Sequence, residues 1–353
     1  MKEIAVLIDW RGMLNADPTD WLLSEDNPSV RYFTLTELLD WPPDAPKVVA
    51  ARRAIMATGP VPAILAGQHP DGYWVKPGHG YGPKYRGTVW SLIYLAQLGA
   101  DGGETHVRAG GEYVLGHTAA STGSFSFTGT PSGALYCLNG NLCAALIDLG
   151  WLGDECLDRA LEWQARAILG EGIALADDRH APLRYYKSGA TGPVFECSAN
   201  NKLPCAWGAV KAMHAFAKLP EFARTPLIER AIRAGLDFLL SRDPAVADYP
   251  MGWNDKPSRN WQRFGFPLFY VTDTLQNLEV LTRFGLAGDP RLDAAIELVH
   301  SQQDDEGRWA LRYHYTGKTW ADVERKGQPS KWVTLRALRV LKRVIKAREQ
   351  CAV

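Results

Sequence analysis

The sequence predicts an all-α fold with an inner layer of helices surrounded by an outer layer. Three observations lead to this prediction: helical periodicity along most of the 353 residues, scarce strand-like alternation, and two helix types that alternate along the chain. One type is rich in glycine, aromatic and small residues, as in GTVWSLIYLAQLG. The other type is more charged, as in RLDAAIELVHSQQ. The apolar type suits inner positions and the amphipathic type suits outer positions.

Each expected helix has apolar residues at i, i+3, i+4 and i+7 spacing. Several begin after proline, aspartate or serine, which favour helix starts. Six helices are candidates for the inner layer, and they are expected to begin at residues 34, 85, 136, 204, 267 and 330. The expected helices span 30–40, 46–57, 85–98, 105–117, 136–149, 155–169, 204–219, 226–241, 267–284, 290–302 and 330–346.

The helices are expected to form a single domain over residues 1–353, with an N-terminal arm at 1–28. Two insertions, 171–203 and 243–264, are rich in glycine, proline, asparagine and aromatic residues, and each precedes an inner helix. Loops of this length inside a compact domain are usually functional or disordered. Their aromatic content favours ordered lids over a site.

Charge and hydropathy narrow the class of protein. Lysine and arginine total 39 against 39 aspartate and glutamate, and such a balance disfavours a nucleic-acid binder. The apolar run at 4–8 is too short for a secretion signal, and no run approaches the roughly 18 residues of a membrane span. We therefore expect a cytoplasmic protein without a membrane span. In that compartment the six cysteines are expected to be thiols or metal ligands.

One motif occurs twice, each time directly after an expected helix. It has the form Gln-x-x-Asp/Glu-Gly-x-Trp, from Gln68 to Trp74 with Asp71 as the acid, and from Gln303 to Trp309 with Glu306 as the acid. The glutamine can bond free helix carbonyls, and the glycine can turn the chain. The acid is expected to accept from the next helix N-terminus, and the tryptophan to pack under the adjoining repeat.

These segments resemble the QW repeats of squalene and oxidosqualene cyclases and the related repeats of protein prenyltransferase β subunits. The phrase YRGTVW at 85–90 also resembles the start of a cyclase inner helix. The resemblance implies an (α/α)6 toroid, two concentric layers of helices, along most of the chain. The Asp-x-Asp-Asp acid motif of the cyclases is absent, so squalene or hopene cyclisation is not expected.

In such a toroid the inner helices begin around one mouth of a central cavity. The segment CSANNKLPC at 197–205 resembles the cysteine pair of linalool dehydratase–isomerase, with a gap one residue shorter. That resemblance implies proton transfer by Cys197 and Cys205, with Asp273, Tyr270 and Cys137 as further catalytic candidates. A carboxyl group on an apolar helix is expected to have a raised pKa. The alternative for Asp273 is a hydrogen bond to a neighbouring inner helix, and the alternative for the cysteines is ordinary burial. The expected substrate-binding residues are Tyr85, Arg86, Tyr136, Asn139, Phe266, Phe269, Trp332 and Lys331.

We expect an enzyme with an apolar central cavity that performs acid–base cyclisation, isomerisation or dehydration on an isoprenoid-like or alkenyl substrate. Three alternatives stay open, and an oligomer is compatible with each. A zinc enzyme of the prenyltransferase kind would draw ligands from Cys137, Cys197, Cys205 and His79. A carbohydrate-active enzyme would use paired carboxylates, and a lipid-binding or scaffold protein would need no converging titratable groups. The carboxylate candidates in the first insertion are Glu171, Asp177, Asp178 and Glu196.

Overall fold

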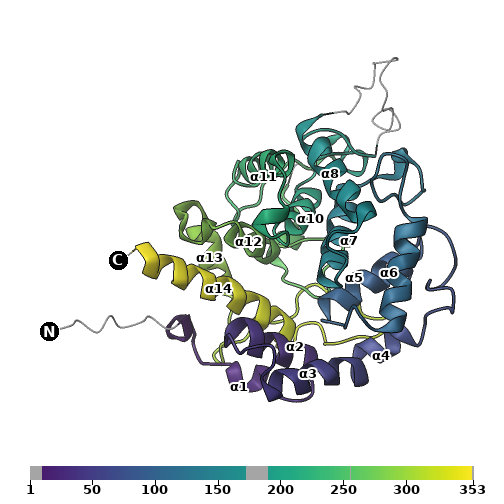
Figure 1. Ribbon diagram of the computed structural model, residues 1–353. Helices are drawn as coiled ribbons and strands as arrows, with labels where there is room; N and C mark the ends of the chain where they lie inside the picture. The colour runs from purple at the N-terminus through teal and green to yellow at the C-terminus, as the bar shows by residue number, and fades with distance from the viewer. Residues whose placement is uncertain (1–9, 172–189, 255, 352–353) are drawn as a thin grey trace.

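The computed structural model describes residues 10–171, 190–254 and 256–351. Within these residues the fold is all-α, as predicted, because the sheet contains just two short strands. Strands β1 (Glu196–Cys197) and β2 (Leu203–Pro204) pair antiparallel in one small hairpin. The helices follow one another around the molecule from α1 to α14 (Figure 1).

Three helices agree with the prediction at both ends. Helices α3 (Pro46–Ala57), α6 (Thr105–His117) and α8 (Glu155–Leu169) begin and end at the predicted residues. The Asp154 side chain caps α8 at its start, and Gly170 ends it in the left-handed conformation that glycine adopts most easily. The other α-helices are α1 (Thr19–Leu22), α2 (Pro28–Phe33), α4 (Pro60–Leu65), α5 (Thr88–Gln97), α7 (Tyr136–Asp148), α10 (Ala206–Phe216), α11 (Pro226–Leu239), α12 (Thr274–Arg283), α13 (Asp293–His300) and α14 (Lys331–Cys351).

Several helices begin later than predicted, α12 and α5 among them. The helix expected at 267 begins at Thr274, because the carboxylate of Asp273 accepts a hydrogen bond from the backbone N–H of Gln276 at 2.7 Å and so caps α12 there. The helix expected at 85 begins at Thr88, after Gly87 in an extended conformation. The helix expected at 30–40 is α2 continued by a π-helical turn, η2 (Thr34–Leu38). Apolar spacing continues through such caps and therefore does not reveal them.

The most buried helices contact one another in sequence order. Helix α5 contacts α7, α7 contacts α10, α10 contacts α12, α12 contacts α14, and α14 contacts both α2 and η2. Each helix from α2 to α12 in this series also contacts a more exposed helix that follows it: α3, α6, α8, α11 and α13. Helices α7 and α10 pack backbone to backbone, since a Cβ atom on Gly140 would lie 2.3 Å from the carbonyl carbon of Lys211.

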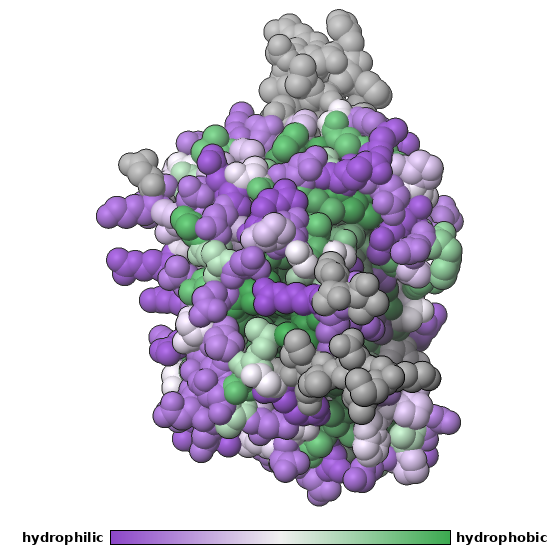
Figure 2. All heavy atoms as spheres, turned by 90° about the vertical axis from the view of Figure 1, so that its left-hand side faces the viewer, coloured by the Kyte–Doolittle hydropathy of each residue, from purple (hydrophilic) through white to green (hydrophobic). Residues whose placement is uncertain are grey.

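The main core is one large set of apolar side chains to which these buried helices contribute most, and Leu35, Val48 and Ala51 form a small second cluster. Fully buried tryptophans, among them Trp74, Trp90, Trp309 and Trp332, are its largest members. Hydrophilic residues cover most of the face seen in Figure 2, and apolar residues lie recessed between them.

The segment Pro46–Leu65 has the length and hydropathy of a membrane span, and it is the one such segment among the described residues. In the structure Thr58 and Gly59 interrupt it, and Gly59 has a positive φ of 73°. The segment therefore forms two helices, α3 and α4, that meet at a bend. The absence of a membrane span stays a prediction.

The two predicted repeats form the same turn. An isolated antiparallel β-bridge pairs the backbone of Gln68 with that of Trp74, and another pairs Gln303 with Trp309. Each indole N–H donates to a carbonyl at the end of the preceding helix, Trp74 to Ile64 at 2.7 Å and Trp309 to Val299 at 2.6 Å. The backbone N–H of each tryptophan donates to a threonine hydroxyl of the next buried helix, at 3.1 and 3.0 Å. The expected role of the acid was wrong, because Asp71 and Glu306 pair with His69 and Arg308 within their own turns.

Two more turns share this geometry although they lack the motif. Bridges join Ala119 to Phe125 and Thr191 to Cys197, with the same spacing of six residues. In all four turns the residue two before the last has a positive φ: Gly72, Gly123, Phe195 and Gly307. We call these the four bridge turns. Cys197 therefore occupies the position that tryptophan or phenylalanine fills in the other three.

Candidate functional site

Two cysteines, Cys197 and Cys205, lie at the ends of the β1–β2 hairpin. The backbone N–H of Cys205 donates to the carbonyl of Phe195 at 2.8 Å, which closes the hairpin. Cys197 stands at the N-cap of a short 3-10 turn, Ser198–Asn200, and Cys205 stands at the N-cap of α10. Each sulfur therefore faces backbone N–H groups that have no partner within the helix that they begin.

The two thiols have opposite environments. The Cys205 thiol donates a hydrogen bond to the sulfur of Cys197, and this bond lowers the pKa of Cys197 to about 7 although burial opposes it. The backbone N–H groups of Ala199 and Asn200 lower the pKa of Cys197 further. The same sulfur–sulfur hydrogen bond, together with burial, raises the pKa of Cys205 well above its usual value. The pair is thus poised as a thiolate at Cys197 and a thiol at Cys205.

A cavity of about 330 Å³ opens beside this pair. Aromatic rings and sulfur atoms make up most of its wall, and no carboxylate or cationic side chain lines it within the described part of the chain. Such a wall favours an apolar ligand and can stabilise positive charge through the faces of its rings. The lining residues are Cys137, Cys197, Ala199, Asn200, Cys205, Ala206, Trp207, Tyr249, Pro250, Met251, Trp253, Trp261 and Tyr270.

The two insertions meet over this cavity. Asn200 donates to the carbonyl of Pro250 at 3.0 Å and accepts from the backbone N–H of Gly252 at 3.0 Å. The indole of Trp253 donates to the carbonyl of Ala199 at 2.7 Å. Residues 190–203 of the first insertion are thereby joined to the second insertion, while residues 172–189 lie outside the described part of the chain.

A group of tyrosines adjoins the thiols. Tyr85 and Tyr270 share a hydrogen bond, and their ring centroids lie 6.1 Å apart. The Lys84 ammonium lies 4.8 Å from the ring centroid of Tyr270 and 5.5 Å from that of Tyr81. Burial, and then the nearness of Cys137, raises the pKa of Tyr81, so this phenol stays protonated. Tyr81 was not among the predicted site residues. The sequence feature that could have indicated it is an aromatic residue between two glycines in the loop before α5.

Cys137 connects this site to a buried lysine. Burial raises the pKa of Cys137 to about 12 and lowers that of Lys211 to about 7. The ammonium of Lys211 donates to the side-chain carbonyl of Gln276, which also accepts from the hydroxyl of Thr272 at 2.6 Å. Lys211 was missed as well, and its signal is a lone charge within the apolar helix CAWGAVKAMHAF.

Asp273 does not line the cysteine cavity. Its carboxylate caps α12 and forms a buried ion pair with Arg336 on α14, at 2.8 Å. Its two oxygens also accept from the backbone N–H groups of Gln276 and Gly265. The alternative of an inter-helix bond is therefore the arrangement present, and Asp273 is not part of the proton-transfer pair.

Four of the expected substrate-binding residues hold the fold together instead. Tyr136 donates to the carbonyl of Gly192 at 2.8 Å, and Asn139 bonds the backbone of Phe125. Arg86 donates to the carbonyl of Thr319 at 3.0 Å, and Lys331 pairs with Asp26. These side chains stand at helix starts, as expected, but their polar atoms are used by neighbouring loops.

The aromatic candidates separate into two places. Phe269 stacks on Tyr85, with ring centroids 5.1 Å apart, next to Tyr270. Phe266 and Trp332 stack on each other at 3.9 Å, and both line a second cavity rather than the cysteine cavity. The expected convergence of all the inner-helix starts on one site is therefore wrong for these two residues.

The described residues do not assemble a metal site. Among them, no group of three or more histidine, cysteine, aspartate or glutamate side chains is placed to hold a metal ion. His79 does not line the cysteine cavity, and its Nδ1 lies 2.6 Å from the carbonyl oxygen of His117. The suggested ligand set of three cysteines and His79 therefore does not fit zinc.

The carboxylate candidates for sugar chemistry can be followed in part within the described residues. Glu171 pairs with Arg230 at 2.6 Å, whereas Asp177 and Asp178 lie outside the described residues.

No protein-family model matches this sequence, and no curated protein matches it either.

Proposed function

We propose that the chain is an (α/α)6 toroid whose cysteine cavity performs acid–base chemistry on an isoprenoid-like or other alkenyl substrate. The sequential contacts of α2, α5, α7, α10, α12 and α14 support the toroid, as does the pairing of most of these helices with a more exposed neighbour. The single observation that carries the function is the sulfur–sulfur hydrogen bond between Cys197 and Cys205. It places an acid and a base side by side at an apolar cavity.

The pair performs a dehydration without any other proton carrier. The Cys205 thiol gives its proton to the hydroxyl oxygen of an alkenol, the C–O bond breaks and water leaves. The Cys197 thiolate takes a proton from the neighbouring carbon, and the electron pair of that C–H bond forms the new double bond. The proton then passes from Cys197 back to Cys205 along their hydrogen bond, which restores the starting state.

Isomerisation uses the same two transfers. Cys205 protonates one end of a double bond, and the Cys197 thiolate removes a proton from a different carbon, so the double bond moves. The positive charge that develops between these steps lies among Trp207, Trp261 and Tyr270, whose ring faces attract cations. The phenol of Tyr270, beside Lys84, is placed to bind a substrate hydroxyl group.

The test is turnover of tertiary allylic alcohols of one to three isoprene units, with products measured by gas chromatography and mass spectrometry in water and in D₂O. We expect release of alkenes by dehydration, and incorporation of deuterium at carbon in the products of isomerisation. Cys197→Ser and Cys205→Ser are each expected to lose at least about 100-fold in kcat/KM, a magnitude typical of a lost acid–base group. The rate of the unmodified protein should rise with pH through about 7, as Cys197 becomes a thiolate.

Cys156→Ser is the matched control, because Cys156 is half-buried on α8 and does not line the cavity. It should keep the full rate. Equal rates in Cys197→Ser and the unmodified protein would overturn the thiol mechanism. Binding of the alcohols without turnover would instead favour a lipid-binding protein.

A further inference from the structure

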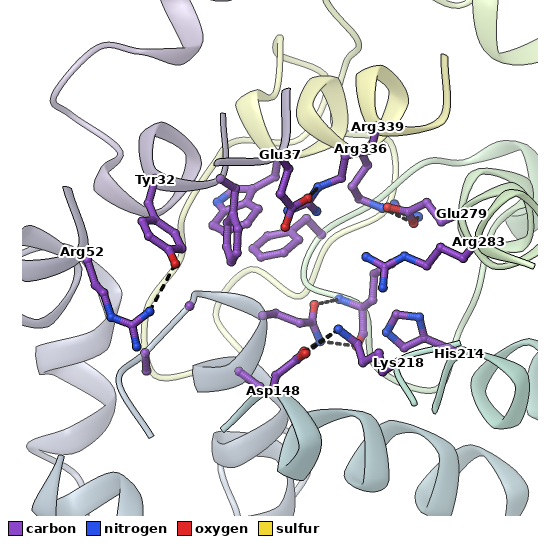
Figure 3. Close-up of a pocket in the computed structure, with 18 residues that line it drawn as sticks. Tyr32, Glu37, Arg52, Asp148, His214, Lys218, Glu279, Arg283, Arg336 and Arg339 are labelled. Carbon is purple, nitrogen blue, oxygen red and sulfur yellow. Dashed lines mark hydrogen bonds and ion pairs between the residues drawn. The ribbon is translucent and has the colours of Figure 1, made fainter. Parts of the chain in front are cut away.

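A second cavity, of about 220 Å³, shares no lining residue with the cysteine cavity. It lies where α5, α7, α10 and α12 end, and α2, η2 and α14 complete it. One wall is apolar, with Phe33, Phe266 and Trp332. The other wall is strongly charged, and Figure 3 shows Arg283, His214 and Lys218 gathered on one side of the cavity.

Most charges in this wall are already paired. Lys218 binds Asp148 at 2.6 Å, and Arg339 pairs with Glu37 (Figure 3). Arg336 binds Glu279 at 2.9 Å as well as Asp273 at the start of α12.

Arg283 is the exception. It makes no hydrogen bond or ion pair with any described residue, although it lines the cavity. Its charge depresses the pKa of its neighbours. Burial and then Arg283 lower the pKa of Arg343 to about 10, and burial, Lys218 and Arg283 lower that of His214. Although burial opposes it, Arg339 and then Arg283 lower the pKa of Glu37, so a carboxylate lies near Arg283, but none among the described residues binds its guanidinium directly.

Two buried nitrogen atoms of residues that line the cavity also lack partners. They are Nδ1 of His214 and Nε1 of Trp332. The indole Nε1 can only donate, and the histidine Nδ1 donates in the tautomer that carries its hydrogen there. A buried donor without an acceptor costs about 1–3 kcal/mol, so such groups call for a ligand that accepts.

The helix ends account for part of this pattern. Lys218 comes shortly after the C-terminus of α10 and Arg283 is the last residue of α12, positions where a cation is favoured by about 0.3–1 kcal/mol. That effect explains why a basic residue stands at each position. It leaves unexplained the unpartnered indole N–H of Trp332, which needs an acceptor and gains nothing from a helix end.

We propose that this second cavity binds an oxyanion, a carboxylate or a phosphate group, against Arg283, with Lys218, His214 and the Trp332 indole as further donors. The anion neutralises Arg283 and accepts from nitrogen atoms that otherwise have no partner. The ring pair of Phe266 and Trp332 gives a small organic body of the ligand an apolar surface to pack on. This site does not depend on the proposed function of the cysteine cavity.

The test is isothermal titration calorimetry of the full chain with inorganic phosphate, pyrophosphate and citrate, each at an ionic strength matched with sodium chloride. We expect at least one of the three to bind, and Arg283→Gln to weaken that binding at least tenfold. Tighter binding of citrate would identify a carboxylate ligand, and tighter binding of phosphate or pyrophosphate would identify a phosphate ligand. Arg291→Gln is the control, since Arg291 is an exposed arginine paired with Asp289, and it should bind like the unmodified protein.

Melting temperatures provide a second measurement. Without added anion, Arg283→Gln should melt at or above the temperature of the unmodified protein, because it removes a charge that no described carboxylate binds directly. With the bound anion at saturation the order should reverse. The proposal is overturned if none of the three anions binds more tightly than chloride, or if Arg283→Gln binds as well as the unmodified protein does.

Discussion

Replacement of Asp273 by asparagine tests the idea that this residue stabilises the fold and takes no part in proton transfer. Its two oxygens accept four hydrogen bonds, two from Arg336 at 2.8 and 3.1 Å and two from the backbone N–H groups of Gln276 and Gly265 at 2.7 and 3.0 Å. Asparagine has one accepting oxygen, so its NH₂ group must face two of these donors. The side chains of Asp273 and Arg336 are 4% and 2% exposed, so water cannot replace the lost bonds.

The expected cost follows from these contacts. Removal of one partner from a buried ion pair costs about 3–5 kcal/mol. Arg336 keeps Glu279 and the carbonyl of Gly265 as partners, at 2.9 and 2.8 Å, which favours the lower end of that range. We therefore expect a loss of about 3 kcal/mol in the free energy of unfolding, which corresponds to a roughly 100-fold larger unfolding equilibrium constant.

Urea titration followed by tryptophan fluorescence measures this loss. Asp289→Asn is a matched control, because Asp289 also caps a helical turn and pairs with an arginine, but at the surface. It should cost much less. Alkylation of Cys197 below the urea transition should be equally fast in Asp273→Asn and in the unmodified protein. A stability within error of the unmodified protein, or a changed alkylation rate, would refute the reasoning.

Three further expectations concern the thiols and the packing. Alkylation of Cys197 by iodoacetamide should rise with pH around about 7, because its pKa is lowered and the thiolate dominates above it; a midpoint near 9 would contradict the hydrogen-bonded pair. Gly140→Ala should cost at least about 3 kcal/mol by urea titration, since its Cβ would meet the Lys211 backbone, and an unchanged midpoint would contradict this close packing. Trp309→Phe should cost about 1 kcal/mol for the hydrogen bond to Val299, and a change several times larger would show that ring packing dominates instead.

The sequence predicts the helices well because apolar spacing reports directly which face of a helix is buried. It predicts the starts of α5 and α12 less well, because caps such as Asp273 depend on side-chain geometry that periodicity does not contain. The motif with glutamine and tryptophan reveals two of the four bridge turns. The other two bridge turns have the same backbone geometry, but Phe125 and Cys197 replace the tryptophan. Their sequences therefore lack the motif.

The candidate site was predicted in part for the same reason. Cys197, Cys205, Cys137 and Tyr270 do line one cavity, since each stands at or just before the start of a buried helix. Phe266 and Trp332 do not, because the direction of a side chain from a helix start decides which cavity it reaches. Lys211 and the second cavity depend on charges brought together from distant segments, which spacing along one helix cannot show.

The bridge turn that ends at Cys197 also bears on how a cavity arises in a closely packed protein. In the other three turns a ring, that of Trp74, Phe125 or Trp309, is buried completely against the next helix. A large aromatic side chain buries about 150–250 Å² and contributes on the order of 4 kcal/mol at about 25 cal/mol per Å². Where the fourth turn carries a thiol instead, the chain gives up much of that contribution and leaves unfilled space beside a reactive sulfur. We infer that the cavity lies where an aromatic ring would be if the fourth turn resembled the other three.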